Sequence, residues 1–161
     1  MSIPAALERR FTSSDPATTR ELAARLAVAA RPGDLICLRG ELGAGKTQFA
    51  KGFGAGLGVT ETINSPSYIL MAEYAGRLPL FHIDLYRLAD ASEALAGGLL
   101  DDRQASGVTL VEWPERMSEL LPASRLDVAI EGGSRGATDD SRTITIRALD
   151  PTLARYLEAA A

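Results

Sequence analysis

The chain has 161 residues, 46% of them apolar and 24% charged, which suits one globular domain with a sizeable core. Its net charge of −4 argues against a free-standing nucleic-acid binder, because neutralising phosphates requires a basic face. The sequence has no apolar run as long as a membrane span and no secretory signal at its start, and its single cysteine can form no internal disulfide. These exclusions predict a cytoplasmic protein with no membrane segment.

The first 40 residues predict a strand, a helix and a second strand. An edge strand is expected near Leu7–Phe11. Asp15 is a suitable N-cap for a helix that begins with proline and runs to about residue 30. A Pro-Gly turn then leads into Leu35–Arg39, a short apolar run that is typical of a buried strand.

Residues 40–47 read G-x-x-x-x-G-K-T, the phosphate-binding loop of nucleoside triphosphatases. Glycines allow successive backbone N–H groups to turn toward phosphate oxygens, and the following helix directs its positive end at the same phosphates. Lys46 would hold the β- and γ-phosphates, and the Thr47 hydroxyl would ligate magnesium. The order strand, glycine loop, helix supports this interpretation. The residues expected to line the nucleotide here are Glu41, Leu42, Gly43, Ala44, Gly45, Lys46 and Thr47.

The helix after this loop contains three glycines, Gly52, Gly54 and Gly56. Each costs about 1 kcal/mol relative to alanine in a helix interior. Either the helix frays early or another element packs closely against its backbone. Gly58 is a natural end for it.

Residues 60–67 are polar and rich in turn-forming residues, and many nucleotide hydrolases place a γ-phosphate-sensing switch loop at this point. Ser65 and Ser67 can hydrogen-bond phosphate or a metal-bound water, or can simply cap the loop. The runs 69–74 and 80–88 that follow predict a hairpin with its turn near Gly76.

The second hairpin strand alternates strictly, with His82, Asp84 and Tyr86 on the face opposite its apolar residues. An acid at this place can hold a metal-bound water or orient an attacking water. The alternative is a solvated strand face. For His82 alone, a structural role is favoured.

Val108–Trp113 has the pattern of a Walker B strand, an apolar run that ends in an acid. Such a strand lies beside the phosphate-loop strand and delivers its acid to the ligand-binding edge of the sheet. Glu112 would therefore reach magnesium directly or through water. Short helices are expected over residues 90–106 and 115–121.

Two further alternating runs, 126–130 and 142–148, and a short C-terminal helix complete the chain. Together the elements predict an α/β fold, a P-loop NTPase-like three-layer α/β/α domain over residues 1–161. Its central sheet would be mixed but mostly parallel, with an antiparallel hairpin at one side.

Four segments in this order resemble the bacterial TsaE (YjeE) family of small ATPases, over roughly residues 12–148. They are the phosphate loop, Ser65-Pro66-Ser67-Tyr68, His82-Ile83-Asp84-Leu85-Tyr86-Arg87-Leu88 and Val111-Glu112-Trp113-Pro114-Glu115. The phosphate loop is shared by a vast superfamily. The last two segments, at these spacings, are much more specific.

The resemblance implies a role in making the threonylcarbamoyladenosine modification next to the anticodon of tRNA. Members bind ATP and Mg²⁺, hydrolyse ATP, and work with TsaD, which transfers the threonylcarbamoyl group, and TsaB. Hydrolysis by such a protein would reset or license the transferase complex, so tRNA would be met indirectly through that complex.

The resemblance also implies roles for individual residues. Thr47 and Glu112 would be the magnesium ligands, while Lys46 and the loop backbone would hold the phosphates. Asp84 would serve the attacking water. Further residues expected at the nucleotide or its switch segment are Ser65, Ser67, Trp113 and Arg142.

The chain departs from the family pattern at two positions. Gln48 stands where the family usually has threonine, and Ser67 replaces the threonine of Ser-Pro-Thr. Serine keeps the hydroxyl, so the switch role is retained. Gln48 can still donate from its amide to an α-phosphate.

The sequence therefore predicts a magnesium-dependent ATPase that is slow alone and coupled to partners. Lys46, Asp84 and Glu112 are the candidate catalytic residues. The alternatives are a P-loop small-molecule kinase and a nucleotide-gated binding module in which hydrolysis is not required.

Overall fold

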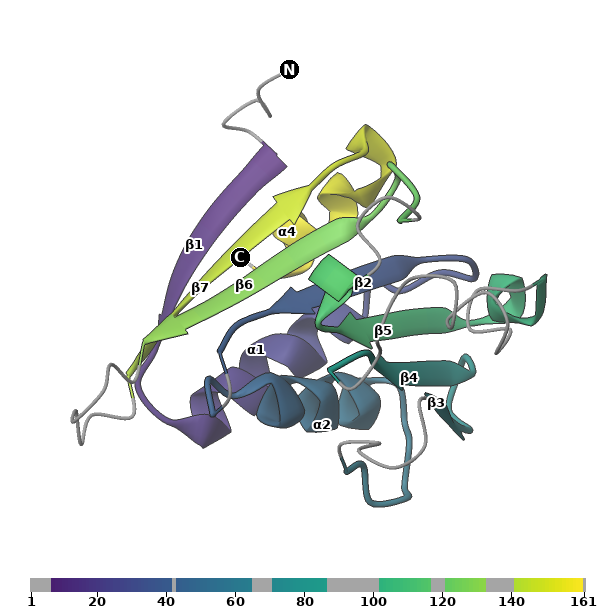
Figure 1. The fold of residues 1–161 in the computed structure, drawn as a ribbon, viewed down its shortest axis with the longest axis horizontal. Helices are drawn as coiled ribbons and strands as arrows, with labels where there is room; N and C mark the ends of the chain where they lie inside the picture. The colour runs from purple at the N-terminus through teal and green to yellow at the C-terminus, as the bar shows by residue number, and fades with distance from the viewer. Residues whose placement is uncertain are drawn as a thin grey trace.

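The computed structural model describes residues 7–41, 43–64, 71–86, 102–116, 121–132 and 141–160. Its centre is a seven-stranded mixed sheet in the order β1-β7-β6-β2-β5-β4-β3 (Figure 1). The strands are β1 (Glu8–Ser13), β2 (Leu35–Arg39), β3 (Met71–Tyr74), β4 (Leu80–Asp84), β5 (Val108–Glu112), β6 (Leu126–Gly132) and β7 (Arg142–Ala148).

The middle of the sheet is parallel and its edges are antiparallel. Strand β2 pairs in parallel with β5 and β6, and β5 pairs in parallel with β4. The β3–β4 hairpin closes one edge, while β7 and β1 close the other. The α/β class, the mixed sheet, the edge strand and the neighbouring positions of β2 and β5 are thus confirmed.

The three α-helices of the described residues pack on one face of the sheet. They are α1 (Pro16–Ala27), α2 (Lys46–Gly56) and α4 (Ala154–Ala160), and α1 lies beside α2 in Figure 1. Asp15 caps α1 as expected, since its side chain accepts a hydrogen bond from Thr18 N at 2.8 Å. The helix ends at Ala27, three residues before the predicted end.

The glycines of α2 are explained by close helix packing. A Cβ on Gly52 would lie 2.2 Å from Arg20 O, and one on Gly56 would lie 2.5 Å from Ala24 O, both on α1. The glycines therefore let the two backbones approach one another. Gly58 has φ +81°, the left-handed conformation that ends a helix.

Both faces of the central strands are buried. Alternate residues of β2, β4 and β5 face the helices. On the opposite face, a smaller cluster consists of Leu35, Cys37, Ile83, Leu85 and Val111. The alternative interpretation, a solvated face on β4, is wrong for His82, which is fully buried. A parallel strand in the sheet interior is covered on both sides.

Some predicted residues and helices lie in parts of the chain that the structure does not describe. Leu42, Ser65, Ser67 and the expected helical residues 90–101 and 117–120 lie outside the described residues. Of the short helices expected over residues 90–106 and 115–121, the described residues 102–106 and 114–116 are 3₁₀-helical. Of the helices in the described ranges, none has the length and apolar character needed to cross a membrane.

Candidate nucleotide site

The glycine loop between β2 and α2 lies at the carboxyl edge of the parallel strands. Gly43 has φ +80° and Gly45 has φ +112°, conformations that residues with a Cβ rarely adopt. A Cβ built on either glycine would meet no heavy atom of the described residues within 4 Å, so among these residues open space adjoins the loop. Gly45 is the N-cap of α2, and no side chain caps this helix end. The first-turn N–H groups and the helix dipole are therefore oriented to receive an anion.

Lys46 is the first residue of α2 and is buried, with 5% of its surface exposed. Its Nζ donates to Gly40 O at 2.7 Å and lies 3.7 Å from the centroid of the Trp113 ring. Burial lowers the pKa of this ammonium group, while the charges of Glu112 and Asp84 oppose the shift. A partly desolvated cation of this kind interacts strongly with phosphate oxygens.

Asp84 and Glu112 end adjacent parallel strands and stand opposite one another in the β4–β5 register. Both side chains belong to the helix-facing side of the sheet, because residues alternate along a strand. Glu112 is buried, and its Oε2 lies 2.5 Å from His82 Nε2. Asp84 is partly exposed, and its Oδ1 accepts from Tyr86 N at 2.9 Å.

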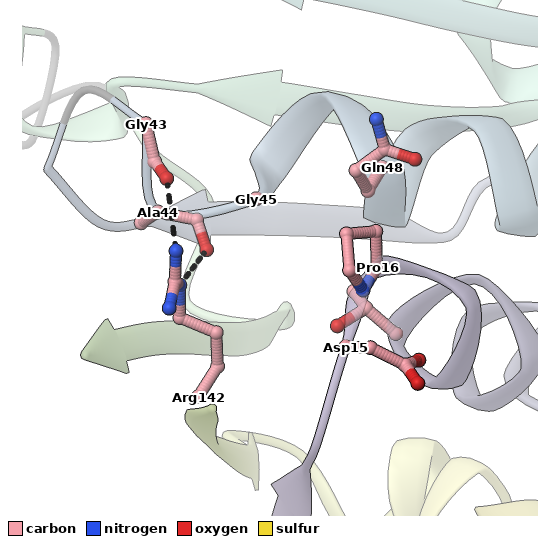
Figure 2. Close-up of a pocket in the computed structure, with 8 residues that line it drawn as sticks. Asp15, Pro16, Gly43, Ala44, Gly45, Gln48 and Arg142 are labelled. Atoms are coloured by element: carbon pink, nitrogen blue, oxygen red, sulfur yellow. Dashed lines mark hydrogen bonds between the residues drawn. The ribbon is translucent and has the colours of Figure 1, made fainter. Parts of the chain in front are cut away.

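Arg142, at the start of β7, contacts the loop from 98 residues away in the sequence. Its Nε donates to Ala44 O at 3.0 Å, and its Nη2 lies 3.5 Å from Gly43 O (Figure 2). These bonds hold two loop carbonyls on one side, while the Ala44 N–H donates within the loop to Glu41 O at 3.0 Å. Arg142 thus lies at the predicted site, where it contacts the loop backbone, and its Nη1 also donates to Ser141 O at 2.9 Å.

A cavity of about 100 Å³ adjoins the loop on this side. It is lined by Asp15, Pro16, Thr19, Gly43, Ala44, Gly45, Gln48 and Arg142 (Figure 2). Gln48 therefore faces the site, and its Oε1 accepts from Arg20 Nη1 at 2.5 Å. With its oxygen held by Arg20, the Gln48 side chain offers its amide N–H groups as donors.

Trp113 follows Glu112 and is the one non-glycine residue of the described chain with a positive φ, at +58°. This conformation turns the chain directly after β5 and brings the indole over Lys46. Tyr86 packs against it, with 5.0 Å between the ring centroids. The two aromatic rings border the site on the side of β4 and β5.

The donor set fits magnesium held together with a nucleotide. Thr47 lies in the first turn of α2 and Glu112 at the end of β5, and hydroxyl and carboxylate oxygens are the hard ligands that Mg²⁺ prefers. Within the described ranges, no three His, Cys, Asp or Glu side chains gather as a metal site. A magnesium ion would then take its other ligands from phosphate and water, as is usual for this ion.

The structure thus places most of the predicted residues around one loop. Glu41, Gly43, Ala44, Gly45, Lys46 and Thr47 form the loop and its helix, while Asp84, Glu112, Trp113, Gln48 and Arg142 surround it. Sequence reasoning did not anticipate the His82–Glu112 bond or the Arg20–Gln48 contact. The alternation of β4 and β5 puts His82 and Glu112 on one face, but only the register reveals that they meet.

Comparison of the sequence with known proteins identifies related chains. The family model for "Threonylcarbamoyl adenosine biosynthesis protein TsaE" matches residues 13–144. The tRNA threonylcarbamoyladenosine biosynthesis protein TsaE of Bacillus subtilis is 44% identical over 87% of this chain and 85% of its own length. The protein of the same name from Treponema pallidum is 40% identical over 71% of this chain and 82% of its own length. The one from Streptomyces coelicolor is 38% identical over 81% of this chain and 90% of its own length.

The fold has a solved counterpart. The crystal structure of YdiB from Bacillus subtilis superposes with a TM-score of 0.74 and 36% sequence identity, over 95% of this chain and 93% of that one. The sequence match and the shared fold lead to the same conclusion: the chain belongs to the TsaE family.

Proposed function

We propose that this protein is a magnesium-dependent ATPase that acts in the threonylcarbamoyladenosine modification of tRNA. The family and the names of its relatives give the pathway. The observation that carries the ATPase proposal is the placement of buried Lys46 behind an open glycine loop, beside two strands that end in Asp84 and Glu112.

Each group has a part in this proposal. The loop N–H groups and Lys46 hold the phosphates and stabilise negative charge as it develops during phosphoryl transfer. Thr47 and Glu112 hold magnesium, which when bound neutralises charge on the phosphate oxygens. Asp84, partly exposed at the edge of the site, orients the attacking water. Gln48 and the cavity beside it receive the part of the nucleotide nearer to α1.

The partners proposed are TsaD and TsaB, with tRNA met through their complex in the cytoplasm.

The Arg142 side chain contacts the loop carbonyls of Ala44 and Gly43. An arginine supplied by a partner would complete charge stabilisation, as it does in other P-loop enzymes. Hydrolysis by the isolated chain would then be slow.

Two variants test whether hydrolysis is required. Glu112→Gln and Asp84→Ala are assayed for ATP binding, for phosphate release and for support of tRNA modification by purified TsaB–TsaD. The proposal predicts that variants that bind ATP without hydrolysing it fail to sustain modification over repeated cycles. Full support by such a variant would contradict the ATPase proposal and favour a nucleotide-gated binding module. A phosphorylated small molecule among the products would instead favour a kinase.

A further inference from the structure

A buried hydrogen bond joins the two strands that carry the acids of the site. In the parallel register, His82 of β4 stands opposite Leu110 of β5, so Glu112 is its diagonal neighbour on the same face. His82 Nε2 lies 2.5 Å from Glu112 Oε2, and the two residues are 0% and 3% exposed. A short bond to a desolvated carboxylate is among the stronger hydrogen bonds in proteins.

The direction of this bond follows from the second ring nitrogen. Among the described residues, His82 Nδ1 is the buried side-chain atom that has no hydrogen-bond partner. A neutral ring with its proton on Nε2 leaves only an acceptor unpaired at Nδ1. A ring with a proton on Nδ1 would bury an unpaired N–H group, which costs more. His82 therefore donates its Nε2–H to Glu112.

We propose that His82 is a positioning residue for Glu112. By holding Oε2, it fixes one orientation of the carboxylate and leaves the second oxygen for magnesium bound with the nucleotide. Ligating carboxylates in metal sites are commonly held in this way by a further hydrogen bond, and loss of that partner typically costs about 10- to 100-fold in metal affinity. The inference rests on the role proposed above for Glu112, and His82 acts only through that residue.

The hydrogen-bond direction can be measured without any nucleotide. His82 is the only histidine in the chain, so nitrogen-15 labelling of tag-free protein gives the spectrum of a single imidazole. We expect one protonated nitrogen, Nε2, whose proton resonance is shifted downfield by the short bond, and an unprotonated Nδ1. A neutral ring with its proton on Nδ1 would overturn the proposal, whether or not the protein proves to be an ATPase.

The consequence for the site is measured by calorimetry with a non-hydrolysable ATP analogue, with and without Mg²⁺. His82→Leu removes the donor and His82→Gln retains an N–H group. Thr109→Val is the matched control, because it changes a buried residue of β5 on the opposite face of the sheet. We expect His82→Leu to reduce the Mg²⁺-dependent gain in affinity about 10- to 100-fold, with little change in affinity without Mg²⁺. His82→Gln and Thr109→Val should behave like the original protein.

The affinity measurements separate a failure of the role of His82 from a failure of the proposed function. Equal loss of affinity with and without Mg²⁺, or no loss at all, would overturn the role of His82. If the original protein itself binds no magnesium nucleotide, the proposed function fails and the imidazole spectrum still tests the hydrogen bond. If the leucine variant does not fold, His82→Asn replaces it with the same expectation, because an asparagine amide is too short to reach Glu112.

Discussion

The Nζ atom of Lys46 lies 3.7 Å from the centroid of the Trp113 ring and 2.7 Å from Gly40 O. The ammonium group is thus held by an aromatic face and one backbone carbonyl, and a contact with phosphate would compete with both. Trp113 is the only tryptophan in the chain, so its fluorescence reports on this exchange.

We expect magnesium-ATP to change the Trp113 emission with the same midpoint as binding measured by calorimetry. The Trp113→Phe variant should lose the signal and still bind nucleotide, since phenylalanine retains an aromatic face over Lys46. Nucleotide binding by calorimetry with unchanged emission would contradict the movement of Lys46 away from the indole ring.

The close contact between α1 and α2 predicts a large stability difference between two similar substitutions. In Gly52→Ala the new methyl group would meet the α1 backbone at Arg20 O, whereas in Gly54→Ala it would meet the end of the Ile63 side chain. Backbone cannot move aside cheaply, so Gly52→Ala should lower the free energy of unfolding by about 2 kcal/mol despite the better helix propensity of alanine. Gly54→Ala should cost clearly less, because a side chain can change rotamer. Urea unfolding compares the two, and equal losses would contradict the packing argument.

Arg142 should support nucleotide binding through the loop backbone. Removing it in Arg142→Ala frees the carbonyls of Ala44 and Gly43, so the loop loses part of its preorganisation. Because a hydrogen bond from a charged group contributes about 1.5–3 kcal/mol, we expect nucleotide affinity to fall about tenfold or more. Arg147→Ala is the matched control, since Arg147 lies on the same strand but pairs with Glu8 of β1. Similar losses in both variants would indicate a general effect on β7.

The buried thiol of Cys37 gives a probe of folding. Burial raises its pKa from 9.0 to about 12, so it stays protonated and unreactive in the folded protein. The unfolded thiol ionises at lower pH than the folded one, so this group contributes stability below pH 9 that is lost as pH rises toward about 12. We expect no alkylation by iodoacetamide at neutral pH until denaturant unfolds the chain. Rapid labelling of the native protein would contradict the burial of β2.

Local patterns predicted those parts of the fold that local chemistry determines. The loop glycines, the Asp15 cap and the alternation of β4 each have a short-range cause, and these elements lie where expected. The position of Glu112 was also predicted locally, because an apolar run that ends in an acid is typical of the strand next to a phosphate-loop strand.

Long-range pairing explains what local patterns did not predict. The burial of His82 depends on the covering of both faces of β4, which becomes apparent only once the sheet order is known. The closeness of Arg142 to the glycine loop depends on how β7 is placed through β6, and no spacing in the sequence encodes that distance. The glycines of α2 indicate either fraying or close packing, and only the three-dimensional structure identifies α1 as the element that packs against them.

The most direct test of the central claim is ATP turnover by the chain alone and with purified TsaB–TsaD complex. Lys46→Ala removes the buried cation at the loop, and Lys51→Ala, which changes the only other lysine, controls for loss of charge on α2. We predict slow turnover alone, stimulation by the complex, loss of both in Lys46→Ala and near-normal activity in Lys51→Ala. No turnover in either condition despite nucleotide binding, or full turnover in Lys46→Ala, would contradict the assignment of this loop as the site of a partner-coupled ATPase.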